Sequence, residues 1–310
     1  MNNNKRIYKA PLIVSILLII MGLFLMLKDR SQDAHTIVCT TSMIGDAVKH
    51  VVGDAYHVKV LMGAGVDPHL YRAKESDVYA LADAEIIFYN GLHLEGKMGE
   101  IFDHLKHRQK TVAVSNGIPR ERLLESTFAD IYDPHIWHDV SLWIQVVNYI
   151  AEICMAHDGK NAVLFQQNAQ AYTARLKELD VWIKQQINVI APQHRILVTA
   201  HDAFSYFARA YGLQVMGLQG ISTESQVSTR DIQYIADYII AHKIPALFLE
   251  ASIPERSIKA VQRAVEARGH NVTIAPELFS DALGDSSTTA HTYHGMIQHN
   301  VSVIVSSLAK

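Results

Sequence analysis

The chain has 310 residues, 49% of them hydrophobic, which is enough for about two domains with buried cores. It carries 28 basic and 31 acidic residues, and this net charge of −3 gives no basic signal for nucleic-acid binding. The two cysteines, Cys39 and Cys154, fit neither a CxxC metal motif nor a disulfide-rich scaffold, so we expect two buried free thiols.

Residues 1–34 differ in character from the rest of the chain. Three basic residues, Lys5, Arg6 and Lys9, precede an apolar run over residues 10–27, which is typical of an export signal. The run is just long enough to span a bilayer, so cleavage and retention as an N-terminal membrane anchor both stay open. No cysteine follows the run directly to take a lipid. We therefore expect an exported protein, in the periplasm or on the outer face of the cytoplasmic membrane.

From residue 36 onward, short β-branched runs alternate with amphipathic helical patterns. The expected strands are Thr36–Thr41, Tyr56–Met62, Glu85–Tyr89 and Thr111–Ser115 in the first half, and Arg195–Ala200, Leu213–Gly217, Ala246–Glu250 and Asn271–Ile274 in the second. The helices expected between them are Met43–Val52, Lys74–Ala84, His93–Arg108, Phe204–Tyr211, Thr229–His242, Pro254–Arg268 and His291–Leu308. This alternation predicts an α/β protein of two lobes, each with a mostly parallel sheet flanked by helices.

Two long helical patterns, Val140–His157 and Asn161–Ile190, lie between the halves. The second would span roughly 45 Å at the standard helical rise, which is more than one small lobe needs. No flexible Gly/Ser hinge is present, so we predict that one long rigid interlobe helix joins the lobes and that they move little. We place the N-terminal lobe at residues 35–160, the connecting helix at 161–190 and the C-terminal lobe at 191–310.

Four side chains are candidates for one metal site. Asp-Pro-His occurs twice, ending at His69 and at His135. His201 closes a predicted strand, and Asp281 follows the last strand of the second lobe. Open α/β sheets place ligands beyond the carboxyl ends of their strands, so these positions suit a site between the lobes. We predict that the four side chains bind one divalent metal ion in the interlobe cleft.

The donor set narrows the choice of metal. Three neutral imidazoles and one carboxylate form a standard Zn²⁺ set, whereas Ca²⁺ or Mg²⁺ would call for more oxygen ligands. Mn²⁺ stays open, because an Asp that binds through both oxygens raises the coordination number above four.

Other readings of these and nearby residues stay open at this point. A histidine after Asp-Pro can merely cap a turn, and Asp281 could be a helix N-cap, as could Asp285. His138 could reach the metal, but we expect it to lie behind the ligands or at the surface. We expect an exposed helix face from His291, His294 and His299, and core packing from Trp137, Trp143 and Tyr149.

A zinc hydrolase with the same ligands is the enzymatic alternative. It would need a general base near an open coordination position, and Glu250, which ends a strand, is the only suitable candidate. The sequence contains no HExxH motif and no GxSxG nucleophile elbow. We therefore expect no enzymatic activity.

Several stretches, in order along the chain, resemble the TroA-type zinc/manganese receptors, which are the metal-binding class of solute-binding proteins of ABC transporters. The matching stretches are Gly63–Tyr71, Tyr89–Glu95, Asp133–Trp137, Val198–Phe204, Gly217–Thr223 and Glu277–Gly284. The resemblance implies two α/β lobes bridged by one long rigid helix, with a buried metal between them. It also implies that His69, His135, His201 and Asp281 are the ligands.

The function expected from this resemblance is capture of Zn²⁺ or Mn²⁺ outside the membrane and delivery to an ABC permease and its ATPase subunit. We expect a monomer that transforms no substrate. Histidine at position 201 resembles the zinc-type and mixed zinc/manganese members. A surface adhesin, a role assigned to some members, is the remaining alternative, with no support in the sequence beyond export.

Overall fold

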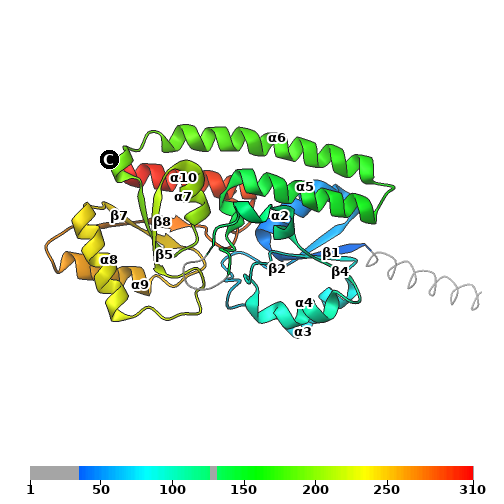
Figure 1. Cartoon of the computed structure of the whole chain (residues 1–310), viewed down its shortest axis with the longest axis horizontal. Helices are drawn as coiled ribbons and strands as arrows, with labels where there is room; N and C mark the ends of the chain where they lie inside the picture. Colours follow the sequence, from blue (N-terminus) through cyan, green and yellow to red (C-terminus); the bar gives the residue numbers. More distant parts are fainter. Residues whose placement is uncertain (1–34, 126–130, 310) are drawn as a thin grey trace, which may run out of the picture.

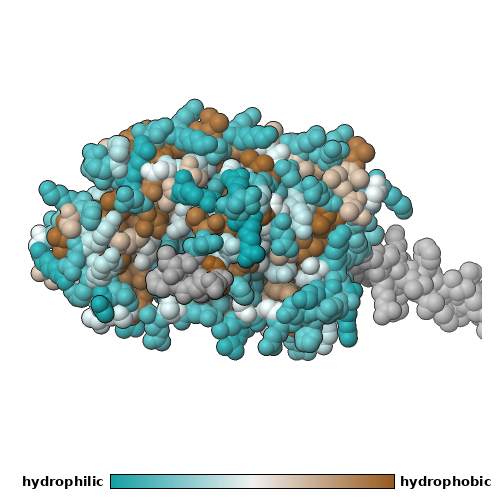
Figure 2. All heavy atoms as spheres, viewed as in Figure 1, coloured by the Kyte–Doolittle hydropathy of each residue, from teal (hydrophilic) through white to brown (hydrophobic). Residues whose placement is uncertain are grey.

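The computed structural model describes residues 35–125 and 131–309, and these fold into two α/β lobes that lie side by side (Figure 1). The expected export segment, residues 1–34, lies outside the described residues. No helix within the described parts of the chain is both long and apolar enough to cross a membrane. Hydrophilic residues cover most of the face of both lobes shown in Figure 2, with hydrophobic residues scattered among them.

The N-terminal lobe is built on a parallel sheet whose strand order is β2-β1-β3-β4. Its strands are β1 (Thr36–Thr41), β2 (His57–Met62), β3 (Ile86–Tyr89) and β4 (Lys110–Ala113). The central strand β1 is buried almost throughout, as its run of β-branched residues predicts. Because all four strands are parallel, their carboxyl ends meet at one edge of the sheet, and this edge faces the second lobe.

Three helices flank this sheet, namely α2 (Ser42–Val52), α3 (Glu75–Asp83) and α4 (Gly99–Leu105). Helix α2 begins where the Thr41 hydroxyl accepts a hydrogen bond from the backbone N–H of Ile44, a typical N-cap. The helix expected over residues 93–108 is wrong in its first two turns. Backbone at Gly91, Leu92 and His93 has φ of 82°, 55° and 64°, which is left-handed and forms a tight loop before α4.

The C-terminal lobe contains two parallel strand pairs, β5 with β6 and β7 with β8, and β5 lies next to β7. The strands are β5 (Ile196–His201), β6 (Gln214–Gln219), β7 (Ala246–Glu250) and β8 (Thr273–Leu278). The helices α7 (Ser205–Tyr211), α8 (Thr229–His242) and α9 (Arg256–Glu266) cover them. The predicted strand positions are therefore confirmed, with ends that differ by a few residues.

Three further helices hold the lobes together: α5 (Val140–His157), α6 (Ala162–Ile187) and α10 (Tyr293–Leu308). Helix α6 has 26 residues and runs along both lobes in Figure 1, which confirms the predicted long interlobe helix. Its buried face belongs to one continuous core that also contains Ile37 of β1 and Phe248 of β7. Because this core crosses the lobes, the division of the chain at residues 160 and 190 stays a prediction.

The same core accounts for several residues singled out in the sequence. Cys39 and Cys154 are both buried free thiols, as predicted, and burial raises the pKa of Cys154 to about 12. Trp137 and Trp143 are fully buried, whereas Tyr149 is half-buried against the core. The two cysteines and the two tryptophans therefore belong to the buried core, and Tyr149 packs at its edge.

Candidate metal site

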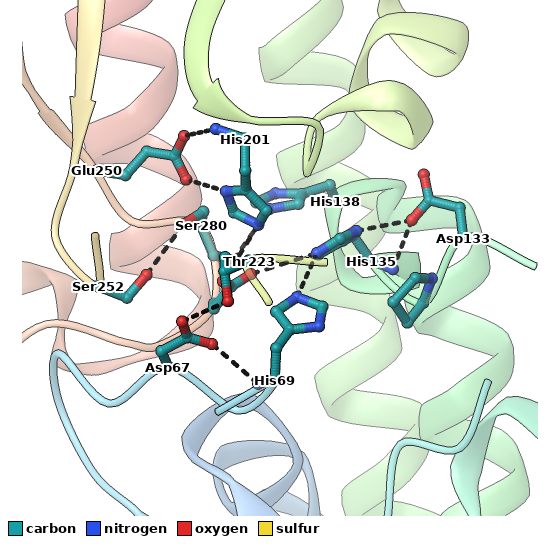
Figure 3. A network of polar contacts seen from close by, with 12 residues as sticks. Asp67, His69, Asp133, His135, His138, His201, Thr223, Glu250, Ser252 and Ser280 are labelled. Atoms are coloured by element: carbon teal, nitrogen blue, oxygen red, sulfur yellow. Dashed lines mark hydrogen bonds and ion pairs between the residues drawn. The ribbon is translucent and has the colours of Figure 1, made fainter. Parts of the chain in front are cut away.

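The first Asp-Pro-His sequence lies in the loop after β2. The Asp67 carboxylate accepts a hydrogen bond from the backbone N–H of His69 at 2.9 Å, which closes a tight turn and directs the imidazole inward. The other oxygen of Asp67 accepts a hydrogen bond from the Thr223 hydroxyl at 2.6 Å. Thr223 follows β6 in the C-terminal lobe, so this contact ties the His69 loop to the opposite lobe (Figure 3).

The second Asp-Pro-His sequence forms the same turn but uses its carboxylate differently. Asp133 Oδ1 accepts a hydrogen bond from the backbone N–H of His135 at 2.9 Å and lies 2.7 Å from the ring Nδ1 of the same histidine. A carboxylate accepts, so the ring proton sits on Nδ1 and the Nε2 lone pair faces the site. An imidazole oriented in this way by a carboxylate is a common arrangement for a metal ligand.

His201 ends β5, and it has its own carboxylate partner on the adjacent strand. Glu250, the last residue of β7, lies 2.6 Å from His201 Nδ1 through Oε2 and accepts a hydrogen bond from the His201 backbone N–H at 2.9 Å. Both residues are buried. Glu250, the candidate general base of the hydrolase alternative, is therefore occupied in orienting His201.

Asp281 lies three residues beyond the end of β8, at the point where the two lobes meet. Its Oδ1 is 3.5 Å from His135 Nε2, and its Oδ2 is 3.3 Å from His201 Nε2. His69 Nε2 completes the group at 3.3 Å from His135 Nε2. One ligand atom from each of the four residues lies within 4.8 Å of all the others, and all four residues are buried. The side chains singled out in the sequence therefore come together.

Burial and mutual charge set the protonation of this group. Burial lowers the pKa of His69 to about 3, so this imidazole is neutral in the ordinary pH range. Burial alone would also lower the pKa of His201, but Glu250 and Asp281 outweigh it and raise this pKa well above its usual value. Burial would raise the pKa of Asp281, and the neighbouring histidines outweigh it and hold this pKa below its usual range.

Three atoms of the group have no hydrogen-bond partner among the described residues: His201 Nε2 and both carboxylate oxygens of Asp281. The 3.3 Å separation between His201 and Asp281 is an ion-pair distance without the alignment of a hydrogen bond. A buried polar atom left unpartnered costs about 1–3 kcal/mol, and more when it is charged. These three buried atoms without hydrogen-bond partners, beside the paired Nε2 atoms of His69 and His135, fit a cation placed among them.

His138 is not part of this group. It is fully buried, its Nε2 lies 3.1 Å from the Ser280 carbonyl oxygen, and burial lowers its pKa to about 3. Of the two expectations for His138, the surface position is wrong, and its role behind the candidate ligands stays a prediction. The exposed helix face was expected too broadly, because α10 begins at Tyr293 after His291, and His294 and His299 are half-buried.

A cavity of about 330 Å³ lies next to the site. His69 lines it together with residues of both lobes, among them His93, Lys97 and Glu224. The Lys97 ammonium and the Glu224 carboxylate are 2.6 Å apart, which links the two lobes at this cavity. Of the four candidate ligands, His69 is the only one that lines this cavity among the residues that the structure describes.

Sequence reasoning missed the residues that orient the candidate ligands. Glu250 was considered only as a base, and neither Asp133 nor Thr223 was assigned a role. The Asp two residues before His69 and before His135 was a signal visible in the sequence, since an Asp at this position closes the turn that presents the imidazole. Thr223 carried no such signal.

Known proteins are similar to this chain over nearly its whole described length. The family described as “Zinc-uptake complex component A periplasmic” matches residues 37–307. The chain is 48% identical over 285 residues to the zinc-binding protein TroA of Treponema pallidum, covering 91% of this chain and 92% of the relative. It is 40% identical over 281 residues to the manganese-binding lipoprotein MntA of Bacillus subtilis, again covering 91% and 92%.

Two more comparisons agree with these. The chain is 30% identical over 289 residues to the manganese ABC transporter substrate-binding lipoprotein PsaA of Streptococcus pneumoniae, covering 91% of this chain and 92% of the relative. The solved structure of periplasmic zinc-binding protein TroA from Treponema pallidum superposes with a TM-score of 0.87 at 47% identity, covering 89% of this chain and 99% of that one. The chain belongs to the family of periplasmic component A proteins of zinc-uptake complexes.

Proposed function

We propose that this protein captures a divalent transition metal, Zn²⁺ or Mn²⁺, outside the cytoplasmic membrane and delivers it to an ABC importer. The proposed ligands are His69, His135, His201 and Asp281. One observation carries the proposal: four buried side chains from both lobes direct donor atoms to within 4.8 Å of one another. The membership in a family of metal-uptake receptors supports it.

The chemistry of the four donors suits a divalent cation as cargo. Three neutral imidazoles and one carboxylate around a 2+ ion leave a net charge of +1, which is a tolerable charge for a buried site with further carboxylates behind it. Tetrahedral Zn²⁺ needs one oxygen of Asp281, whereas Mn²⁺ prefers more oxygen ligands and would use both. Among the relatives, TroA is named for zinc and MntA for manganese, so both ions stay candidates.

The same geometry supports binding without catalysis. A catalytic zinc site keeps an open position for water or substrate, whereas a site with four protein ligands is closed. The one carboxylate suited to general-base work, Glu250, is hydrogen-bonded to His201. The adhesin alternative is not favoured, because the relatives are named as metal-binding or substrate-binding proteins of transporters.

The location and partners of the protein follow from this role. We propose that residues 1–34 direct export and are then either cleaved or kept as an anchor on the outer face of the membrane. The monomeric receptor would then deliver its ion to a permease whose ATPase subunit lies on the other side. Some relatives are lipoproteins, and this chain lacks a cysteine directly after its apolar run.

Metal content and metal-dependent stability test the proposal. We expect the protein purified without added metal to hold about one Zn²⁺ or Mn²⁺ per chain by elemental analysis. Removing the ion with a chelator should lower the melting temperature, and adding either ion back should restore it. Free metal at 100 times its Kd stabilises the fold by about 2.7 kcal/mol. A protein without bound metal, whose melting temperature no divalent ion changes, would contradict the proposal.

A further inference from the structure

One backbone oxygen next to the candidate ligand Asp281 accepts two hydrogen bonds from side chains. The Ser280 carbonyl lies 2.7 Å from the indole Nε1 of Trp137 and 3.1 Å from His138 Nε2. Both donors are fully buried, and both come from the short 3-10 turn that directly follows His135. Figure 3 shows His138 and Ser280 beside the His201 imidazole.

This carbonyl belongs to the peptide group that carries the backbone N–H of Asp281. A peptide group is planar, so fixing its oxygen also fixes the direction in which the Asp281 backbone leaves it. The carboxylate of Asp281 has no hydrogen-bond partner among the described residues, so no side-chain hydrogen bond of its own sets its direction. Its position therefore depends on how the backbone on either side is held.

Other backbone anchors hold the segment at its two ends, and the Ser280 hydroxyl lies 3.3 Å from the Ser252 hydroxyl. Asn300 of α10 accepts a hydrogen bond from the Phe279 backbone N–H at 2.9 Å and donates one to the Phe279 carbonyl at 2.8 Å. Ser42 accepts a hydrogen bond from the Leu283 backbone N–H at 2.8 Å. Between these points, the hydrogen bonds of Trp137 and His138 to the Ser280 carbonyl are the backbone contacts nearest to the carboxylate.

We infer that His138 is a positioning residue that holds Asp281 with both carboxylate oxygens toward the metal. In the structure, Oδ1 is turned toward His135 and Oδ2 toward His201. The inference rests on the proposed metal-binding function. It assigns His138 an effect on metal preference, because a carboxylate presented through both oxygens favours Mn²⁺, which takes more than four ligands, over tetrahedral Zn²⁺.

Packing alone does not explain a histidine at this position. The His138 ring packs against Phe204, with the ring centroids 4.4 Å apart, in surroundings that suit a phenyl ring equally well. Its Nδ1 is buried without a hydrogen-bond partner among the residues that the structure describes. An unpartnered buried nitrogen destabilises the fold, so the contribution of the imidazole has to come from the other nitrogen, which meets Ser280.

The test compares His138→Phe, which keeps a ring but removes the donor, with His138→Gln, whose amide N–H can reach the same carbonyl. Kd values for Mn²⁺ and Zn²⁺ would be measured by competition with a chelator, and the visible spectrum of bound Co²⁺ would report the coordination number. In His138→Phe we expect Mn²⁺ affinity to fall about 10-fold to 100-fold, as is typical when a group behind a ligand is lost. Zn²⁺ affinity should fall less, the Co²⁺ spectrum should change, and His138→Gln should restore both affinities in part.

Metal-free thermal melts separate positioning from a merely structural role. Because the phenyl ring removes an unpartnered nitrogen, we expect the metal-free His138→Phe protein to melt at or above the temperature of the wild type. If this variant fails to fold, Trp137→Phe removes the other donor to the same carbonyl and should shift the Mn²⁺ to Zn²⁺ preference in the same direction.

Two results would overturn the inference. One is an unchanged ratio of Mn²⁺ to Zn²⁺ affinity in His138→Phe. The other is a loss of affinity that follows the loss of metal-free stability and that His138→Gln does not reverse. In both cases a wild type that binds metal would leave the proposed function in place, whereas a wild type that binds neither ion would contradict the proposed function as well.

Discussion

The two Asp-Pro-His loops have the same sequence and make the same turn, but they use their carboxylates for different purposes. In each, the Asp accepts a hydrogen bond from the histidine backbone N–H at 2.9 Å. Asp133 then binds the ring of its own histidine, whereas Asp67 reaches Thr223 in the opposite lobe. The Asp133 carboxylate fixes the tautomer and direction of a candidate ligand, and the Asp67 carboxylate fixes the position of a loop between the lobes.

This difference shows where local sequence stops deciding structure. The turn follows from Asp, Pro and the backbone alone, since a short acidic side chain can bind the N–H two residues on. The second partner of each carboxylate depends on which side chain the rest of the fold brings near it. We therefore expect the His135 loop to control the strength of metal binding and the His69 loop to control how the site opens.

The largest expected effect comes from removing a proposed metal ligand, either in the two Asp-Pro-His loops or in the C-terminal lobe. His69→Ala, His135→Ala, His201→Ala and Asp281→Ala each remove one of the four proposed metal ligands. Each should lower metal affinity by more than the about 10-fold to 100-fold that follows when a group behind a ligand is lost. The measurement is competition with a chelator of known affinity.

Asp285→Ala provides the matched control for these variants. Asp285 is four residues from Asp281 and exposed, and it accepts a hydrogen bond from the Ser287 backbone N–H at 2.9 Å. Its loss should leave metal affinity unchanged. An Asp285→Ala variant as impaired as Asp281→Ala would mean that the ligand set is misassigned.

Lowering the pH should weaken metal binding first through His201 in the C-terminal lobe and only at lower pH through His69. With a pKa raised well above its usual value, metal-free His201 holds a proton that an incoming ion must displace. The proton is bound below this pKa and lost above it, so metal affinity should rise with pH and level off once the metal-free imidazole is neutral. His69, with a pKa lowered to about 3, offers no such competition above pH 5.

Titrations with Zn²⁺ between pH 5 and pH 7.5 measure this effect. Where one proton is displaced for each ion bound, affinity changes about 10-fold per pH unit, which corresponds to about 1.36 kcal/mol. Calorimetry in buffers with different ionisation enthalpies should show protons released on binding. Equal affinity at both ends of the range would count against a site with three histidines.

A smaller effect separates the two loops directly. In Asp133→Asn, the amide oxygen can still accept both hydrogen bonds that Asp133 Oδ1 accepts from His135, but it lacks the negative charge that makes the imidazole a more basic ligand. We expect metal affinity to fall about 10-fold to 100-fold. Asp67→Asn keeps an oxygen for the His69 N–H and should change affinity much less. A larger loss in Asp67→Asn than in Asp133→Asn would reverse our assignment of the two loops.

The sequence predicted the parts of this site that depend on residue type and on strand ends. The four candidate ligands follow strands or tight turns, and the alternation of apolar runs placed those strands within a few residues. Glu250 could not be paired with His201 in this way, because their contact depends on β7 lying next to β5. The first turns expected before α4 also failed, because the left-handed backbone at Leu92 and His93 overrides their helical pattern.

The smallest effect concerns the contact between the lobes. Thr223→Val removes the hydroxyl that donates to Asp67 but keeps the side-chain volume. A hydrogen bond from a neutral donor to a carboxylate contributes about 1.5–3 kcal/mol at most. In Thr223→Val, water can replace the hydroxyl at the Asp67 oxygen, so the loss of metal-binding free energy should be below that range.

We expect faster metal release in Thr223→Val, with a Kd that rises less than tenfold, because the hydroxyl contacts the loop and not the ion. Stopped-flow transfer of the metal to a chelator measures the release rate. The comparison variant is Lys97→Met, which breaks the exposed pair with Glu224, an interaction worth about 0–1 kcal/mol. Release from Thr223→Val that is no faster than from Lys97→Met would show that the half-buried contact between Thr223 and Asp67 does not hold the lobes closed.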